Sequence, residues 1–199
     1  FTKQVPQADI SRSEQDSLSY IAAENQYMNG NCEKAVDGFN KYISKFPEGS
    51  FILEANFYKA ECDYRSQRYD NALKSYEFIM GQQRSRFTAN AASRSAQIQH
   101  TRGNYEAALE SYIRLEETAD QPGMVINALS GQMQCNYTLK RYGLAIQSAQ
   151  KLLNLDKLTQ NQATEAHITI ARSANALSNT DLARKEYEET VKLSKNEMA

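Results

Sequence analysis

Residues 68–76 read RYDNALKSY, residues 104–112 read NYEAALESY and residues 141–149 read RYGLAIQSA. Two related stretches flank them, NCEKAVDGF at 31–39 and NTDLARKEY at 179–187. All five stretches share one alanine, and successive alanines are 37, 36, 37 and 38 residues apart: Ala35, Ala72, Ala108, Ala145 and Ala183. A nearly fixed period of this length is typical of proteins built from repeated supersecondary units.

Each repeat also has a recognisable first half. Twelve residues before each alanine lies a second landmark, which is small in four of the five copies: Ala23, Ala60, Ala96, Met133 and Ala171. A short polar break separates the two halves, and two of the breaks contain Gly30 and Gly103, a residue type that ends helices well. Each repeat is therefore predicted to be two segments joined by a tight turn.

Both segments have helical character. In residues 69–79, apolar side chains step by three and four positions, which places them along one side of a helix. Small landmark residues let the two helices of a unit approach closely, and larger neighbours pack on the next unit, because one pair alone cannot bury its apolar face. We predict an all-α fold, a right-handed superhelical α-solenoid of five helix-turn-helix units near 16–50, 53–86, 89–121, 126–159 and 164–197.

This pattern resembles the tetratricopeptide repeat family. The shared features are a small residue at position 8, Gly at 15, Tyr at 17, Ala at 20, an aromatic residue at 24 and Pro at 32, and they recur over residues 16–195. The chain departs from the family in its longer units and in its lack of tryptophan. In addition, Met133 replaces a small residue, Ala149 replaces an aromatic one, and unit one alone keeps the proline, Pro47.

A narrower resemblance concerns the junction of units one and two. The longer period and the order of apolar residues there are similar to the YbgF-like and BamD-like envelope proteins of Gram-negative bacteria, with matches at Phe39, Phe46, Pro47, Ala55 and Tyr58. This resemblance implies a periplasmic or envelope-associated location and a role in envelope assembly, with the cytoplasm as the alternative location.

The N-terminal segment, residues 1–15, precedes the single repeat array of 16–199. Phe1 lies five residues before Pro6, just as Tyr42 lies five residues before Pro47. We therefore interpret residues 1–6 as the tail of an earlier repeat in a longer array.

Composition and motifs exclude several functions. The formal net charge of −1 gives no electrostatic footprint for nucleic acid, and no run of about 18 apolar residues is present to cross a membrane. The three cysteines are far apart and odd in number, which predicts buried thiols and argues against a disulfide framework. His100 and His167 lack ligand-spaced neighbours, and no nucleophile, base and orienting group come together. We predict no enzyme activity, no metal and no cofactor.

A helical solenoid offers a concave surface, which in the tetratricopeptide family is lined by the first helix of each unit. Carried over position by position, this family feature predicts a peptide-binding groove. Its predicted residues are Tyr20, Glu24, Tyr27, Phe57, Glu61, Tyr64, Arg94, Gln97, His100, Gln134, Tyr137 and Arg172.

Two patterns stand out in this set. Position 12 holds a ring in four consecutive units, Tyr27, Tyr64, His100 and Tyr137. These rings either anchor a peptide or pack against the first helix of the next unit and expose only a polar tip. Acidic residues in units one and two give way to amides in units three and four, which either suits a basic or amide-rich ligand or is an ordinary solvated face.

A carboxylate clamp, which some family members use to hold a terminal carboxylate, is not expected. Of the residues at the clamp positions only Arg94 agrees with the clamp, and Glu24 would repel a carboxylate. The function that fits best is a non-catalytic scaffold or adaptor that binds a peptide or partner helix in the groove. The alternative is an architectural or self-associating spacer within a longer protein of the same family.

Overall fold

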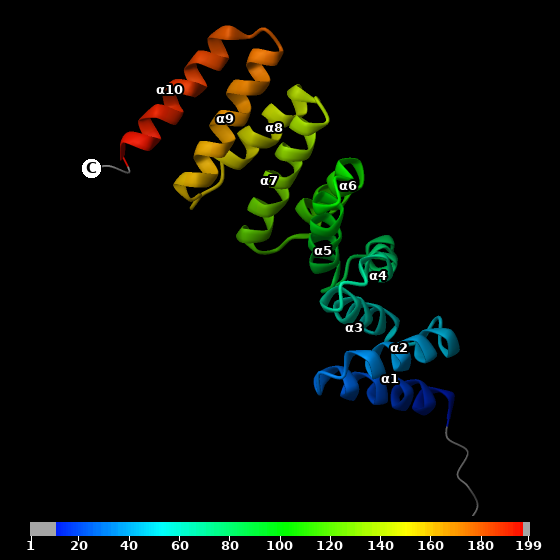
Figure 1. Cartoon of the computed structure of the whole chain (residues 1–199). Helices are drawn as coiled ribbons and strands as arrows, with labels where there is room; N and C mark the ends of the chain where they lie inside the picture. The colour runs from blue at the N-terminus through cyan, green and yellow to red at the C-terminus, as the bar shows by residue number, and fades with distance from the viewer. Residues whose placement is uncertain (1–10, 197–199) are drawn as a thin grey trace, which may run out of the picture. The chain divides into compact units, whose positions relative to one another are not determined.

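The computed structural model describes residues 11–196, and these form helices joined by short connections (Figure 1). The all-α prediction is confirmed for this range. The helices are α1 Arg12–Met28, α2 Cys32–Lys45, α3 Ile52–Arg65, α4 Tyr69–Gly81, α5 Thr88–Thr101, α6 Tyr105–Thr118, α7 Pro122–Thr138, α8 Tyr142–Leu153, α9 Gln160–Ala176 and α10 Thr180–Asn196. The hypothesis about residues 1–6 concerns residues outside the described range.

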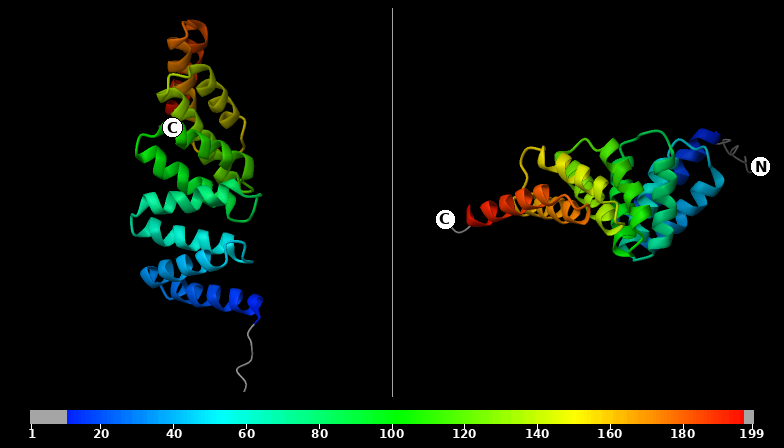
Figure 2. Two further views of the ribbon diagram at one scale, coloured as in Figure 1. Left: turned by 90° about the vertical axis from the view of Figure 1, so that its right-hand side faces the viewer. Right: turned by 90° about the horizontal axis from the view of Figure 1, so that it is seen from above.

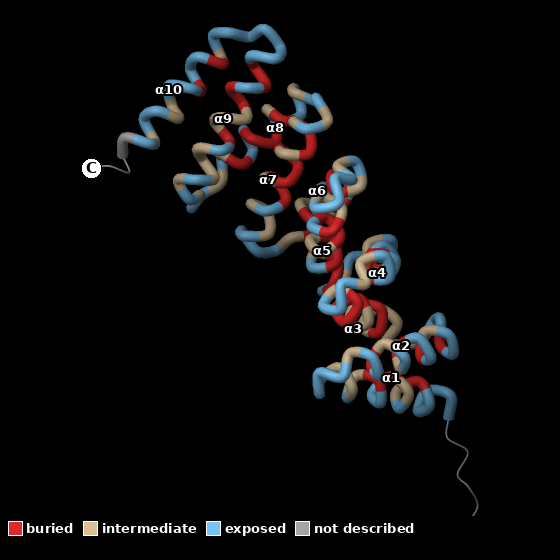
Figure 3. Tube along the Cα trace, viewed as in Figure 1, coloured by how far each residue is buried: buried red, intermediate tan, exposed pale blue. Residues whose placement is uncertain are grey.

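The helices fall into two compact units, one containing α1–α4 and ending at Gln82, the other containing α5–α10 and beginning at Gln83. Within each unit, consecutive helices pack as antiparallel hairpins, and each hairpin packs on the next (Figure 2). The buried residues lie on the helix faces that meet, as Figure 3 shows for both units.

Every hairpin turn has the same backbone. Five residues before each landmark alanine, the chain adopts a positive φ at Gly30, Gln67, Gly103, Lys140 and Ser178. The N–H of each of these residues donates to the carbonyl three residues earlier, and the next N–H donates to the carbonyl five residues before it. This is the Schellman arrangement, which satisfies the last carbonyl groups of a helix and needs a left-handed residue at its turn. The polar breaks predicted a tight turn at all five places and a glycine helix end at two of them, whereas the left-handed residues of the other three turns are Gln67, Lys140 and Ser178.

The landmark residues lie where two helices cross. Ala23, Ala35 and Ala60 are buried in the first unit, and a methyl group added to Gly38 would lie 2.8 Å from the Cβ of Ala23. The crossing of α1 and α2 thus depends on the absence of a side chain at Gly38. The close approach predicted from small residues is confirmed here.

Aromatic residues fill the first unit between α1, α2 and α3. Tyr20 stacks on Phe51 with ring centroids 4.4 Å apart, and Phe39 and Tyr42 are fully buried beside them. The Tyr42 hydroxyl donates to Asp16 Oδ1 at 2.6 Å.

Asp16 links the start of α1 to the loop after α2. Its Oδ2 accepts a hydrogen bond from the backbone N–H of Ser50 at 3.0 Å, while its Oδ1 accepts from Tyr42. Burial by itself raises the pKa of this carboxyl, but the hydrogen bonds from Tyr42 and Ser50 outweigh burial, so the pKa of Asp16 is lowered. The carboxylate is therefore a structural anchor of the first unit.

A disulfide joins Cys32, the first residue of α2, to Cys62 of α3, with the Cα atoms 5.2 Å apart. The expectation that no disulfide framework is present is therefore wrong for this pair. The odd count misled because the third cysteine, Cys135, stays a free thiol, and burial raises its pKa to about 11.

In the second unit, one close approach fixes how α7 crosses α6. The Tyr112 ring lies directly against Gly131, and any Cβ at that position would collide with it. Met133 is fully buried two residues further on, where other repeats have alanine. Gly131 therefore faces α6, whereas Met133 packs on the other side of α7, in the cluster with Leu152 and Ile170.

Ion pairs connect successive second helices in this unit. Arg141 at the start of α8 makes two hydrogen bonds, at 2.9 and 2.7 Å, to the carboxylate of Glu106 on α6. Glu116 on α6 accepts from Lys151 of α8 at 2.9 Å and from Gln132 of α7 at 2.7 Å. Burial opposes ionisation of Glu116, but these hydrogen bonds outweigh it and lower its pKa.

Candidate functional site

The second unit has a surface hollow of about 490 Å³ between α7 and α9. It lies between the first helices of two consecutive repeats. The lining residues are Gln134, Tyr137, Thr138, Asn161, Thr164, Glu165, Ile168, Thr169 and Arg172.

Helical spacing accounts for this lining. On α9, the lining residues recur every three to four positions from Asn161 to Arg172, so they form one stripe along the helix. The opposite side of α9 carries the buried residues Ala166 and Ile170. The same helix therefore packs on α8 with one face and presents polar side chains with the other.

The lining of the hollow includes hydrogen-bonding side chains and both charges. Gln134 Nε2 donates to Glu165 Oε1 at 2.7 Å, and this bond between two lining residues links α7 to α9. Glu165 and Arg172 are both exposed, and Ile168 lies between them in sequence and is half-buried. This combination offers donors, acceptors, two opposite charges and one apolar contact, which are the groups that recognise a peptide rather than a small apolar ligand.

Three of the residues predicted for the groove thus meet in one hollow: Gln134, Tyr137 and Arg172. The other residues predicted for the groove in this unit, Arg94, Gln97 and His100, lie on α5. Of these, Gln97 is exposed, whereas Arg94 and His100 are half-buried.

Two residues predicted for the groove lie in the core of the first unit instead. Tyr20 is 4% exposed, with its ring stacked on Phe51, and its hydroxyl donates to Glu24 Oε1 at 2.7 Å. Glu61 is 9% exposed and accepts from the Tyr76 hydroxyl at 2.6 Å. Both predictions placed a side chain by family position alone, and the aromatic packing of this unit turns both inward.

The other predicted residues of the first unit are half-buried. The Tyr27 ring lies 4.7 Å from the ring of Tyr58 on α3, and the Arg65 guanidinium lies over the Tyr27 ring at 5.4 Å from its centroid. Phe57 contacts Tyr58 edge-on at 5.8 Å. These rings therefore form part of the packing between α1 and α3.

The ring ladder at position 12 has a structural partner in the other three repeats as well. Tyr64 packs edge-on against Tyr69, His100 against Tyr105 and Tyr137 against Tyr142, with centroids 5.7, 5.4 and 5.8 Å apart. In each case the partner is the first residue of the second helix in the same hairpin. Of the four rings, Tyr27 packs against the first helix of the next repeat, which is one of the two predicted alternatives. The other three rings pack against the second helix of their own hairpin.

Part of the α9 lining lies outside the groove predicted from the sequence. Asn161 and Thr164 belong to an extra turn, because α9 begins at Gln160 rather than near 164. A capping box marks this start: the Thr159 hydroxyl accepts from the N–H of Gln162, and the Gln162 side chain accepts from the N–H of Thr159. The Thr-x-x-Gln pattern was the available signal.

The remaining candidates for chemistry have structural roles. His167 Nδ1 lies 2.6 Å from Glu186 Oε2 and joins α9 to α10. Within residues 11–196, no group of three or more His, Cys, Asp or Glu residues is arranged to hold a metal ion. Over the same range, no helix combines the length and the apolar character needed to cross a membrane.

The fold defines a helical-repeat protein, in which consecutive helices form antiparallel hairpins. A family model described as tetratricopeptide repeat matches residues 16–49, the span of most of α1 and all of α2. The resemblance to the tetratricopeptide repeat family is thereby confirmed, while the YbgF-like and BamD-like part of it stays a prediction. No curated protein sequence matches the chain.

Solved structures share the fold over nearly the whole chain. The crystal structure of MamA protein is 12% identical, with 93% of this chain and 94% of that chain covered and a TM-score of 0.64. A MamA segment from Desulfovibrio magneticus RS-1 is 12% identical, covering 96% and 99%, with a TM-score of 0.57. BtubC from P. vanneervenii is 15% identical, covering 94% and 82%, with a TM-score of 0.58. At these identities the likeness establishes the fold alone.

Proposed function

We propose that this protein is a non-catalytic interaction module that holds a peptide or partner helix in the groove between α7 and α9. The observation that carries the proposal is the hollow itself, where side chains from two successive first helices converge. A segment lying across both helices would satisfy the amide of Gln134, contact the Tyr137 ring and meet the opposite charges of Glu165 and Arg172. Repeat proteins commonly use such extended surfaces for binding.

Mixed charge in the groove favours a ligand that itself carries both charges. Glu165 is one helical turn from Ile168 and two turns from Arg172, so a basic, an apolar and an acidic group of the ligand would follow one another along α9. The first unit contributes less to such a site, because Tyr20 and Glu61 are buried there.

A matched pair of charge reversals tests this function. Glu165→Lys changes the groove, and Glu110→Lys makes the same change at an exposed position of α6, outside the groove. Peptides selected from a random display library on the native protein are measured against both variants by fluorescence polarisation. We expect Glu165→Lys to weaken binding at least about tenfold, the equivalent of about 1.4 kcal/mol, and Glu110→Lys to leave it unchanged. Equal binding by the two variants, or failure to select any peptide, would count against the groove.

We also propose that the protein works in an oxidising compartment, with a scaffold role in envelope assembly as the concrete form. The support is the Cys32–Cys62 disulfide, since disulfides persist outside the reducing cytosol. Cells that produce the protein are lysed directly into denaturant with an alkylating agent, and the modified cysteines are identified by mass spectrometry. We expect Cys135 alone to be alkylated, because Cys32 and Cys62 are bonded to each other. Three alkylated cysteines would favour the cytoplasm.

A further inference from the structure

The first helices of two successive hairpins in the second unit carry the same polar residues. Residues 90–101 of α5 read NAASRSAQIQHT, and residues 127–138 of α7 read NALSGQMQCNYT. Asn, Ser, Gln and Thr recur at the first, fourth, eighth and twelfth positions of both stretches. Apart from a buried alanine at the second position, Ala91 and Ala128, the remaining positions all differ.

The four recurring residues form one stripe along each helix, because steps of three and four positions return to the same side. These sets are named the α5 stripe and the α7 stripe. Every member is exposed or half-buried. Gln134 and Thr138 of the α7 stripe also line the hollow between α7 and α9, so the α5 stripe extends the proposed groove by one helix.

The two stripes share a hydrogen bond and are in direct contact. The Thr101 hydroxyl donates to the carbonyl of Gln97 at 2.8 Å, and the Thr138 hydroxyl donates to the carbonyl of Gln134 at 2.9 Å. Asn127 Nδ2 of the α7 stripe donates to Ser93 Oγ of the α5 stripe at 3.4 Å. The second unit therefore presents one polar surface twice, on neighbouring helices.

Neither core packing nor helix stability explains why the stripes are identical. Asn, Ser and Thr are weaker helix formers than Ala, Glu or Lys, and no member of either stripe is buried. Buried positions of the same helices differ instead, as Ala96 and Met133 do. Binding of the same chemical group by both helices accounts for a repeated exposed surface.

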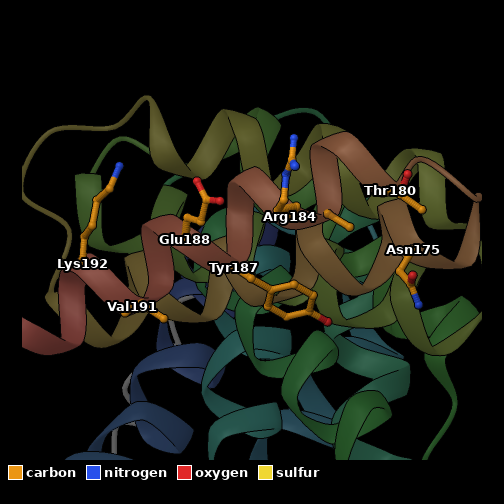
Figure 4. A pocket seen from close by; sticks show the side chains of 8 residues that line it. Asn175, Thr180, Arg184, Tyr187, Glu188, Val191 and Lys192 are labelled. Atoms are coloured by element: carbon orange, nitrogen blue, oxygen red, sulfur yellow. The ribbon is translucent and has the colours of Figure 1, made fainter.

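The chemistry of the stripes indicates which group this is. Their amides and hydroxyls both donate and accept hydrogen bonds and carry no charge. The hollow along α10 differs, since Figure 4 shows the charged side chains of Arg184, Glu188 and Lys192 on its lining. Uncharged donors and acceptors suit the N–H and C=O groups of a peptide backbone. An extended chain leaves these groups free, whereas an α-helix bonds them internally.

The distance between the stripes sets the spacing within such a ligand. Helices α5 and α7 contact each other, and packed helices lie about 8–10 Å apart. An extended or polyproline II chain advances about 3.1–3.3 Å per residue, so three residues take it about 9–10 Å, from one stripe to the next.

We propose that the groove binds an extended segment whose residues i and i+3 present their backbone groups to the α5 stripe and the α7 stripe in equivalent ways. This inference rests on the proposed function, and it names the conformation and the repeat of the ligand. Glu165 and Arg172 then contact the part of the ligand that continues across α9.

Amide-deletion variants on the two stripes test the spacing. Peptides selected on the native protein from a random display library are measured by fluorescence polarisation against Gln97→Ala and Gln134→Ala. Gln150→Ala, at an exposed position of α8 outside the groove, is the matched control. Each stripe variant should weaken binding about two- to tenfold, and the control should leave it unchanged. Circular dichroism of all three variants should match the native spectrum, since alanine is the better helix former.

N-methylation of the peptide, one residue at a time, then removes single backbone donors. We expect one N-methyl position whose effect is lost in Gln97→Ala and a second, three residues away, whose effect is lost in Gln134→Ala. Coupled positions seven residues apart would indicate a helical ligand, and a lack of coupling to Gln97 would confine binding to the hollow between α7 and α9. Either result would overturn this inference and leave the proposed function in place, whereas a library that yields no peptide would overturn both.

Discussion

We expect Gly103→Ala to destabilise the protein and Lys140→Gly to stabilise it, although the two residues have the same role in their hairpins. Both adopt a left-handed backbone, with φ of +76° and +58°. A Cβ added at Gly103 would meet no atom within 4 Å, so the packing of neighbours does not enter the comparison. The effect of each substitution is then a property of the backbone.

The magnitudes follow from two opposing contributions. A side chain in the left-handed region costs about 1–2 kcal/mol, whereas glycine loses about 0.5–1 kcal/mol more conformational freedom on folding than alanine does. Gly103→Ala should therefore cost about 1 kcal/mol, and Lys140→Gly should contribute a gain of up to about 1 kcal/mol. The midpoint of thermal unfolding should shift by about 2–4 °C for each kcal/mol in a chain of this size.

Urea unfolding followed by far-ultraviolet circular dichroism measures both changes. Gly143→Ala is the matched control: its added Cβ also meets nothing within 4 Å, but Gly143 lies in helix α8, where alanine is the better residue. The same substitution should thus raise the urea midpoint at 143 and lower it at 103. If Gly103→Ala leaves the midpoint unchanged, or if Lys140→Gly lowers it, the common left-handed turn is not what limits these hairpins.

Two further substitutions and one reduction test the packing within each unit. Asp16→Asn should lower the free energy of unfolding by about 1–3 kcal/mol. Because the pKa of Asp16 is lowered in the folded protein, the carboxylate stabilises the fold above its unfolded pKa of about 3.9, and this stabilisation is lost as pH falls through the folded pKa. The urea midpoints of the native protein and the variant should therefore converge in acid. Gly131→Ala should lower the free energy of unfolding by about 1–3 kcal/mol, because the new methyl group collides with Tyr112. The double variant with Tyr112→Leu should lose less stability than the sum of the two single variants. Additive losses would mean that the ring and the glycine are not in contact. Reduction of Cys32–Cys62, which closes a loop of 30 residues, should lower stability by about 3–4 kcal/mol in calorimetry, and an unchanged melting curve with dithiothreitol would show that the bond does not constrain the fold.

The sequence predicted the hairpins well because their signals are local and repeated. A period of 36–38 residues, a helical stripe in each half and polar breaks suffice to locate helix pairs. The groove was harder, since family positions specify which side of a helix faces outward only where packing is regular. Tyr20 and Glu61 failed for this reason: the aromatic cluster around Phe51 and the acceptor needed by Tyr76 draw them into the core.

Contacts between residues of two different repeats could not be predicted, because the sequence pattern describes each repeat separately. To predict the lining of the hollow on α9, the start of that helix must be known, and the capping box at Thr159 sets this start. The close approach of Tyr112 to Gly131 needed the crossing of α6 and α7. In both cases the relevant residues are present in the sequence, but their partners are set by geometry rather than by spacing.

The disulfide and the ring ladder have one explanation in the repeat register. Three residues before the landmark alanine, the second, third and fourth repeats have Tyr69, Tyr105 and Tyr142, each packed edge-on against the ring at position 12 of its own hairpin. The first repeat has Cys32 at that position. Without the tyrosine, the Tyr27 ring packs on α3 of the next repeat.

Cys62 and Cys135 occupy equivalent positions, two residues after the first-helix landmark, yet only Cys62 is bonded. The reason is the preceding hairpin. The hairpin before Cys62 has Cys32 three residues before its landmark alanine. The hairpin before Cys135 has Tyr105 at that position, and a tyrosine cannot form a disulfide. The first hairpin thus replaces an aromatic contact within the repeat by a covalent link to the next one, which ties α2 to α3.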